Sequence, residues 1–63
     1  MTMKFWEAMK IIDEGGKVKR SDWGWFVEWC GLVNGRVMLR KGDDFEVYEP
    51  SASDFTSKDW VEV

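Results

Sequence analysis

Residues 17–40, KVKRSDWGWFVEWCGLVNGRVMLR, contain the strongest fold signal in the chain. Asn34 and Gly35 stand between two apolar runs, and an Asn-Gly pair is the usual two-residue connection of a β-hairpin, because both central residues take positive φ. This loop fixes the register of the two strands, so that Trp29 pairs with Arg40. The same residues include three of the five tryptophans and the single cysteine.

The register divides the hairpin side chains between two sheet faces, because successive residues of a strand point to opposite sides. The face expected to hold the core carries Phe26, Cys30, Leu32, Val37 and Leu39. The other face is also apolar but contains arginine, and it carries Trp25, Val27, Trp29, Val33, Arg36, Met38 and Arg40. One helix cannot cover both faces, so the second is a candidate surface for a ligand or another subunit.

The sequence on either side of the hairpin predicts two helices and further strands. Residues 3–14 have apolar side chains at helical spacing and are expected to form a helix that ends at the glycine pair 15–16. Alternating patterns predict strands at residues 17–20, 45–48 and 59–63. Ser51 or Ser53 can cap a short helix between the last two strands. We expect a single α+β domain over residues 1–63, with the N-terminal helix packed on an antiparallel sheet of four to five strands and a short second helix before the last strand.

The composition limits the possible functions. A chain of 63 residues makes one domain with a small core, and such domains usually need a disulfide, a metal, self-association or dense aromatic packing. One Cys and no His allow neither an internal disulfide nor a zinc site, so aromatic packing and self-association remain. The net charge of −3, with charges interspersed along the chain, argues against general nucleic-acid binding.

The expected localisation is the cytoplasm, without contact to a membrane. No apolar run approaches the ~18 residues of a membrane span. The N-terminus has no apolar stretch typical of a signal peptide. A lone Cys30 within a strand pattern fits a reducing compartment.

Few side chains of the sequence suit catalysis, a cofactor or a metal. General-base chemistry most often uses His, which is absent, and the apolar neighbours of Cys30 make its thiol inert. Lys41-Gly42-Asp43-Asp44 is a turn by composition, and a calcium loop would need more oxygen ligands than this turn supplies. We therefore expect no enzymatic activity, no cofactor and no metal site.

Aromatic side chains next to cations suggest a nucleotide site. Trp23 and Trp25 follow Arg20, and a flat ring beside a guanidinium suits a nucleobase and a phosphate. Trp23 lies in a predicted turn, which favours presenting its ring to a ligand over packing it in the core. Arg20 can grip a phosphate with two hydrogen bonds. Trp29 and Arg40 form a similar pair, for which a structural cation–π contact across the hairpin is the alternative.

Four short motifs occur in order along the whole chain: Phe5-x-Glu7-Ala8-Met9, Gly16-Lys17-Val18-x-Arg20, Trp23-Gly24 and Ser53-Asp54-Phe55-x-Ser57-x-Asp59-Trp60. Their order and spacing resemble those of small phage proteins, the Thoeris anti-defence proteins of the second type. The resemblance implies a compact α+β fold that assembles into dimers or tetramers and has no catalytic activity. It also implies binding of a cyclic nucleotide signal, an isomer of cyclic ADP-ribose, which is thereby kept from the host's immune effector. Some relatives are type II-A anti-CRISPR proteins.

The resemblance also implies which residues form the site. Phe5 and Trp23 match aromatic positions of the first motifs, and Asp54, Asp59 and Trp60 match the closing motif. Together with the aromatic and cationic residues named above, the expected ligand site consists of Phe5, Arg20, Trp23, Trp25, Asp54 and Asp59. The expected subunit interface consists of Trp6, Trp29, Met38 and Arg40.

The leading hypothesis is a phage or prophage counter-defence protein that binds a small nucleotide signal between subunits and does not transform it. Two alternatives fit the same sequence. The Trp/Arg face can dock onto a host defence protein or complex, such as a CRISPR effector, because Trp, Met and Arg are enriched at protein interfaces. The chain can also be a small structural interaction module.

Overall fold

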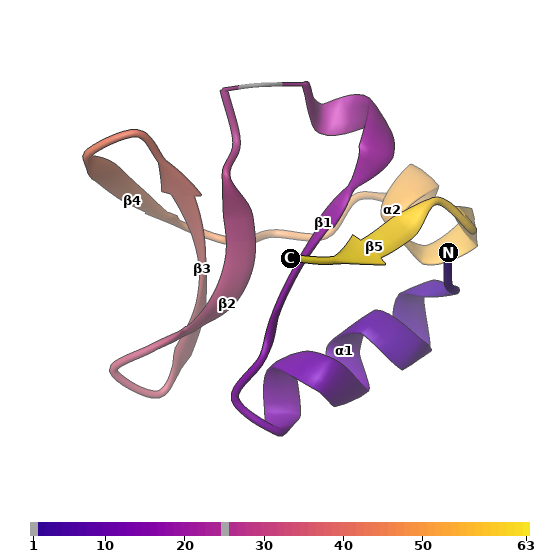
Figure 1. Ribbon diagram of the computed structural model, residues 1–63, viewed down its shortest axis with the longest axis horizontal. Helices are drawn as coiled ribbons and strands as arrows, with labels where there is room; N and C mark the ends of the chain where they lie inside the picture. The colour runs from indigo at the N-terminus through magenta and orange to yellow at the C-terminus, as the bar shows by residue number, and fades with distance from the viewer. Residues whose placement is uncertain (1, 25) are drawn as a thin grey trace.

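The structure is a computed structural model that describes residues 2–24 and 26–63 (Figure 1). Trp25, which the sequence places in the ligand site and on the second hairpin face, lies outside the described residues. In chain order the elements are α1 (Phe5–Asp13), β1 (Lys17–Arg20), the 3₁₀ turn η1 (Ser21–Trp23), β2 (Trp29–Val33), β3 (Arg36–Lys41), β4 (Asp44–Val47), α2 (Ala52–Thr56) and β5 (Trp60–Glu62). The predicted α+β fold is confirmed, including the short second helix before the last strand. None of the described helices combines the length and apolarity that crossing a membrane requires.

The five strands form one antiparallel sheet in the order β4-β3-β2-β1-β5 (Figure 1). The hairpin of β2 and β3 has the register that its Asn-Gly turn predicts, with Trp29 opposite Arg40. Asn34 and Gly35 have φ values of 53° and 80°, and a type I′ turn requires such positive values. The last strand, β5, pairs with β1, which brings the C-terminal segment beside the residues that follow α1.

Replacing Gly35 by valine is expected to lower the free energy of unfolding by about 1–3 kcal/mol. Nothing lies within 4 Å of the place that a new Cβ would take, so the loss comes from the positive φ, which a β-branched side chain resists. Urea unfolding followed by circular dichroism measures this effect. Arg36→Val is the control, because valine suits the adjacent strand position. An unchanged urea midpoint for Gly35→Val would contradict the type I′ turn.

The core lies between α1 and one face of the sheet. Ala8 and Ile12, four residues apart on the same side of α1, are buried against side chains from the strands. The buried cluster consists of Ala8, Ile12, Val18, Cys30, Tyr48 and Trp60. Trp60 is fully buried and donates its indole N–H to the backbone oxygen of Asp54 at 3.2 Å, which ties β5 to α2. Val37 and Leu39 of the hairpin pack against this cluster, as predicted.

Three apolar side chains near the hairpin lie differently from the prediction. Phe26 and Leu32, predicted in the core, are 55% and 44% exposed, and Val27, predicted on the opposite face, is buried. Phe26 and Val27 differ from the prediction because β2 begins only at Trp29, so the strict alternation of side chains between the two faces does not extend back to residues 26–28. Leu32 comes shortly before the turn, at the tip of the hairpin, where α1 does not cover it.

The other side of the sheet, called the open face below, is formed by alternate residues of the five strands: Lys17, Lys19, Trp29, Gly31, Val33, Arg36, Met38, Arg40, Phe45, Val47 and Val61. The core side is where α1 contacts β1, β2 and β5, and α2 contacts α1 there. On the open face, Phe45 and Val47 are consequently 42% and 54% exposed. Within the described residues, the helices thus leave this face uncovered, as the sequence predicts.

Candidate functional site

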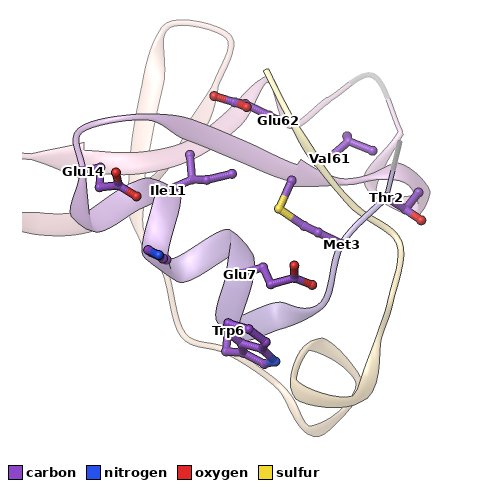
Figure 2. A pocket seen from close by; sticks show the side chains of 9 residues that line it. Thr2, Met3, Trp6, Glu7, Ile11, Glu14, Val61 and Glu62 are labelled. Carbon is purple, nitrogen blue, oxygen red and sulfur yellow. The ribbon is translucent and has the colours of Figure 1, made fainter.

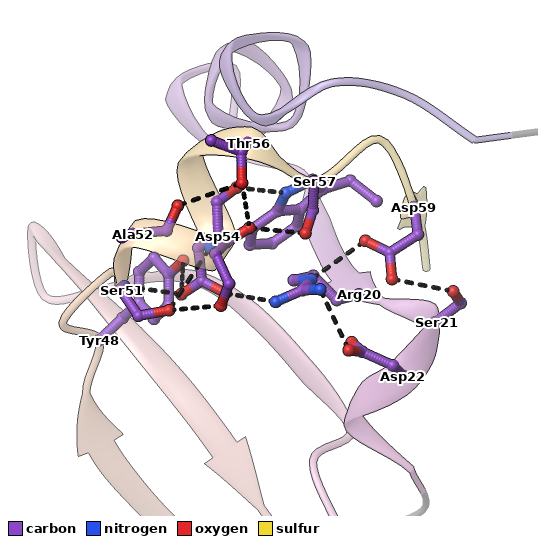
Figure 3. A network of polar contacts seen from close by, with 12 residues as sticks. Arg20, Ser21, Asp22, Tyr48, Ser51, Ala52, Asp54, Thr56, Ser57 and Asp59 are labelled. Atoms are coloured by element: carbon purple, nitrogen blue, oxygen red, sulfur yellow. Dashed lines mark hydrogen bonds and ion pairs between the residues drawn. The ribbon is translucent and has the colours of Figure 1, made fainter.

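A buried arginine joins several separate segments of the chain. Arg20, the last residue of β1, donates from Nη1 to Oδ1 of Asp54 at 2.8 Å and from Nε to Oδ1 of Asp59 at 3.0 Å (Figure 3). Its Nη2 donates to Oδ2 of Asp22 at 3.0 Å. Three carboxylates thus surround one guanidinium, and they hold β1, η1, α2 and the residue before β5 together.

Asp54 accepts further hydrogen bonds within this network. Its Oδ2 accepts from the hydroxyl of Tyr48 at 2.9 Å and from the backbone N–H of Ser51 at 3.0 Å (Figure 3). Ser51 is the N-cap of α2, and its hydroxyl accepts from the backbone N–H of Asp54 at 3.4 Å, which completes a capping box. A helix of five residues is unstable by itself, so these bonds and its packing keep α2 in place.

The network changes the interpretation of Arg20, Asp54 and Asp59. The sequence predicts that Arg20 grips a phosphate, but each of its three nitrogens already donates to a carboxylate. One arginine among three aspartates gives a negative local charge, which disfavours a phosphate at this point. We therefore assign these residues a structural role beside the site instead of a direct phosphate contact.

The same contacts shift the pKa of two carboxyl groups. Burial by itself raises the pKa of Asp54, but hydrogen bonds from Ser51, Arg20 and Tyr48 outweigh burial and bring the pKa below its usual value. Burial likewise opposes the shift at Asp59, whose pKa is lowered by its hydrogen bond to Arg20 and by the charge of that guanidinium. The folded protein therefore favours the charged form of both groups.

Stability is expected to fall as the pH drops below about 4, because unfolded Asp has a pKa of about 3.9 and both folded groups have lower values. Their contribution is fully present above the unfolded pKa and is lost as the pH falls through the folded pKa values. Thermal melting from about pH 7 to about pH 2 measures it. Asp59→Asn should flatten the acid part of this profile relative to the wild-type protein. Identical profiles for the variant and the wild type would contradict the assignment.

Trp23 and Phe5, the aromatic residues expected to hold a ligand, both pack against Trp60. Trp23 lies edge-on to Trp60, with 5.2 Å between ring centroids, and to Tyr48 at 6.0 Å. Phe5 lies edge-on to Trp60 at 5.6 Å and contacts Phe55 at 4.7 Å. The sequence predicts that a turn presents Trp23 away from the core, but η1 folds the ring back onto it. Trp23 is only half-buried, and its remaining surface borders a groove.

This groove has a volume of about 380 Å³ and is called the aromatic groove below. Its lining residues are Arg20, Trp23, Phe26, Val27, Leu39, Lys41, Tyr48, Glu49, Ser51, Ser53 and Asp54. A second hollow of about 390 Å³ is lined by Phe26 and Lys41 as well, together with Glu28 and Gly42. Because the two hollows share two side chains, they are neighbouring parts of one concave surface on the core side of the sheet.

Sequence reasoning missed Phe26 and Lys41 as groove residues. It assigned Phe26 to the core and Lys41 to a turn, whereas Lys41 ends β3 and its Nζ lies 2.5 Å from Oε2 of Glu46. Residues 25–27 are three apolar residues in a row, and consecutive strand residues cannot all face the core. This run is the signal that could have placed Phe26 outside the core. No local signal places Lys41, because its position depends on the pairing of β3 with β4.

The four residues predicted for a subunit interface lie on two different surfaces. Trp29, Met38 and Arg40 belong to the open face, whereas Trp6 projects from α1 and is 65% exposed. Trp6 borders a hollow of about 730 Å³ next to β5, called the Trp6 hollow below (Figure 2). The other side chains around it are Thr2, Met3, Glu7, Lys10, Ile11, Glu14, Val61 and Glu62.

The cation–π contacts of the open face differ from the predicted pair. Trp29 and Arg40 are register partners, but Nζ of Lys17 lies 4.7 Å from the centre of the Trp29 ring. The guanidinium of Arg40 lies 4.9 Å from the centre of the Phe45 ring instead. The prediction considered the hairpin alone, and the pairing of β4 with β3 places Phe45 opposite Arg40.

Cys30 and Tyr48 are buried side chains that carry a thiol and a hydroxyl group. Burial, together with the charge of Asp54, raises the pKa of the Cys30 thiol to about 12. Burial also raises the pKa of Tyr48, whose hydroxyl donates to Asp54. Both groups therefore stay protonated at neutral pH, which makes them poor nucleophiles and bases.

A comparison with protein families identifies the family of the chain. A family model described as Tad2-like, the Thoeris anti-defense 2-like domain, matches residues 3–63. No curated protein matches the chain. The matched range includes α1, the whole sheet, the Arg20 network and the aromatic groove.

Proposed function

Because the chain belongs to the Thoeris anti-defense 2-like family and so has an anti-defence role, we propose that it acts by sequestering a small cyclic nucleotide that the host uses as an immune signal. The proposed ligand is an isomer of cyclic ADP-ribose or a related compound. Binding keeps this signal from its effector, so the protein has no need to transform it. The proposed place of action is the infected bacterial cell.

The aromatic groove is the observation that supports this proposal best. Small-molecule sites are usually hollows of about 300–1,000 Å³ with mostly apolar walls and a few polar groups. The aromatic groove has a volume of about 380 Å³, and Phe26 and Trp23 supply rings beside which a base can stack. Stacking on an aromatic side chain contributes about 1–3 kcal/mol per base.

The polar side chains of the groove suit the rest of a nucleotide. Lys41 is placed to meet a phosphate, and its ion pair with Glu46 is exposed enough to exchange partners at little cost. The hydroxyl oxygens of Ser51 and Ser53 lie 2.9 Å apart, and with Glu49 they offer donors and acceptors to ribose hydroxyls. The Arg20 network supports this arrangement by fixing α2, which carries Ser53.

We propose binding without turnover because the groups available for hydrolysis are in unreactive states. The sequence contains no His, and the pKa of Cys30 is about 12. Asp54 borders the groove, but Arg20, Tyr48 and the backbone of Ser51 already occupy its oxygens. A carboxylate held in this way is a weak base, which favours release of the nucleotide unchanged.

Thermal unfolding with a cyclic ADP-ribose isomer tests the proposal. A ligand that binds only the folded state, present at about 100 times its Kd, adds about 2.7 kcal/mol to the unfolding free energy and raises the Tm. Linear ADP-ribose is the control, and it should give a smaller shift. After heat denaturation, chromatography should recover the cyclic compound intact. Sequestration is contradicted if no isomer raises the Tm, and binding without turnover is contradicted if a converted product appears.

We further propose that copies of the chain associate through the Trp6 hollow. Trp6 is largely exposed, and Met3, Ile11 and Val61 add apolar surface around it. Sedimentation velocity at micromolar concentration is expected to show a dimer or tetramer, which Trp6→Ser should dissociate because it removes the largest apolar side chain. Leu32→Ser, at the exposed tip of the hairpin, is the control. A monomeric wild-type protein would contradict this self-association.

A further inference from the structure

The open face has a charge that the overall composition hides. Its strand positions include four of the nine Lys and Arg residues of the chain and none of the twelve Asp and Glu residues. The charges are interspersed along the sequence, but the two-residue period of the strands collects Lys17 and Lys19 of β1 and Arg36 and Arg40 of β3 on one side. A chain with a net charge of −3 therefore presents a basic sheet face and is acidic elsewhere.

Two of these cations are held over aromatic rings. Lys17 lies over Trp29 at 4.7 Å, and Arg40 lies over Phe45 at 4.9 Å. The two rings meet edge-on, with 6.0 Å between their centroids. The Trp29 ring also extends across Gly31, because a Cβ at that glycine would lie 3.3 Å from ring carbons. The cations are thus partly ordered before any partner binds, which lowers the entropy cost of binding.

Most of this positive charge is available to a partner. Within the described residues, Lys17, Lys19 and Arg36 form no ion pair. Arg40 is partly compensated at the margin of the face, where its Nε lies 3.8 Å from Oε2 of Glu28. The centre of the face is apolar, and the exposed Phe45 and Val47 continue it to the edge strand β4. An apolar centre with a charged rim is the usual composition of a protein interface.

We propose that the open face is a docking surface for an acidic surface of a partner protein. Charge complementarity carries this assignment, because a rim of lysine and arginine attracts carboxylates and repels other cations. A second copy in a symmetric face-to-face contact would oppose the same cations to one another, which disfavours self-association here. This surface lies on the opposite side of the sheet from the aromatic groove, so it does not rest on nucleotide binding.

Single-stranded nucleic acid is a less suitable occupant. Base stacking needs uncovered ring faces, and here Lys17 and Arg40 lie over the rings of Trp29 and Phe45. The acidic remainder of the molecule also repels a long polyanion, whereas a protein contact is confined to the basic face.

Fluorescence anisotropy with defined probes tests the assignment. The first probe is a labelled twelve-residue peptide in which Glu alternates with Val and Phe, the second is the same peptide with Lys in place of Glu, and the third is labelled oligo(dT). The triple variant Lys17→Gln, Lys19→Gln, Arg36→Gln removes charge from the open face. The control variant Lys4→Gln, Lys10→Gln, Lys58→Gln removes the same charge elsewhere.

The acidic peptide is expected to bind the wild-type protein, and the open-face variant should weaken its binding about tenfold or more. The control variant should bind like the wild type, and the Lys peptide should not bind. Sedimentation of the open-face variant should match that of the wild-type protein. Four results would overturn the proposal: no binding of the acidic peptide, equal weakening by both triple variants, tighter binding of oligo(dT) than of the peptide, or loss of self-association in the open-face variant.

Discussion

Arg20→Met is expected to lower the free energy of unfolding by about 3–5 kcal/mol. The substitution removes the only cation among Asp22, Asp54 and Asp59 in the network and leaves the buried Asp54 carboxylate uncompensated. Removing one partner of a buried ion pair lowers the free energy of unfolding by about 3–5 kcal/mol. The whole domain has roughly 3–9 kcal/mol of stability, on the basis of about 0.05–0.15 kcal/mol per residue. The loss is therefore a large part of the total.

Far-UV circular dichroism and urea unfolding measure this loss. Arg36→Met makes the same chemical change at an exposed position of β3 and should leave the urea midpoint nearly unchanged. If Arg20→Met melts within a few degrees of the wild type, the network does not hold α2 and β5 to β1, and its carboxylates are free for another role.

The hairpin is the part of the fold that the sequence predicts most completely. Its signal is local: two residues that tolerate positive φ between two apolar runs set the turn, and the turn sets the register up to Trp29 opposite Arg40. The helix α1 is predictable for a similar reason, because the spacing of Ala8 and Ile12 marks one buried side within a few residues.

The Arg20 network shows where sequence reasoning stops. Asp54 and Asp59 are 34 and 39 residues from Arg20 along the chain, and only the pairing of β5 with β1 brings them together. From the sequence, an arginine close to tryptophans indicates a phosphate site, and nothing local indicates three carboxylate partners. The prediction located residues that do lie near one another, but it did not include the hydrogen bonds that the three carboxylates accept from Arg20.

Trp23 shows a related limit. Its place in a turn suggests an exposed ring, but the turn is a 3₁₀ segment that packs the ring against Trp60 and Tyr48. Trp23→Ala is therefore expected to lower stability and would not isolate an effect on binding. Phe26 is the better test position, because its side chain lines the same groove and is more exposed.

Phe26→Ala is expected to weaken nucleotide binding by about 5- to 150-fold, since the loss of one stacking contact costs about 1–3 kcal/mol. The fold should remain, because Phe26 is 55% exposed and is not among the side chains that pack against the buried cluster. Lys41→Gln should weaken binding of a phosphate-containing ligand in the same direction and make binding less sensitive to salt. Two matched controls are Phe45→Ala, on the open face, and Lys58→Gln, outside the groove.

Calorimetric titration of a cyclic ADP-ribose isomer into the wild-type protein, Phe26→Ala and Phe45→Ala tests the central claim most directly. Binding to the aromatic groove predicts a saturable wild-type isotherm, a Kd raised about 5- to 150-fold in Phe26→Ala, and a Phe45→Ala isotherm that matches the wild type. Equal Kd values for the wild type and a folded Phe26→Ala, or loss of binding in Phe45→Ala alone, would place the site outside the groove. The absence of any binding heat across the cyclic ADP-ribose isomers at several temperatures would contradict nucleotide sequestration itself.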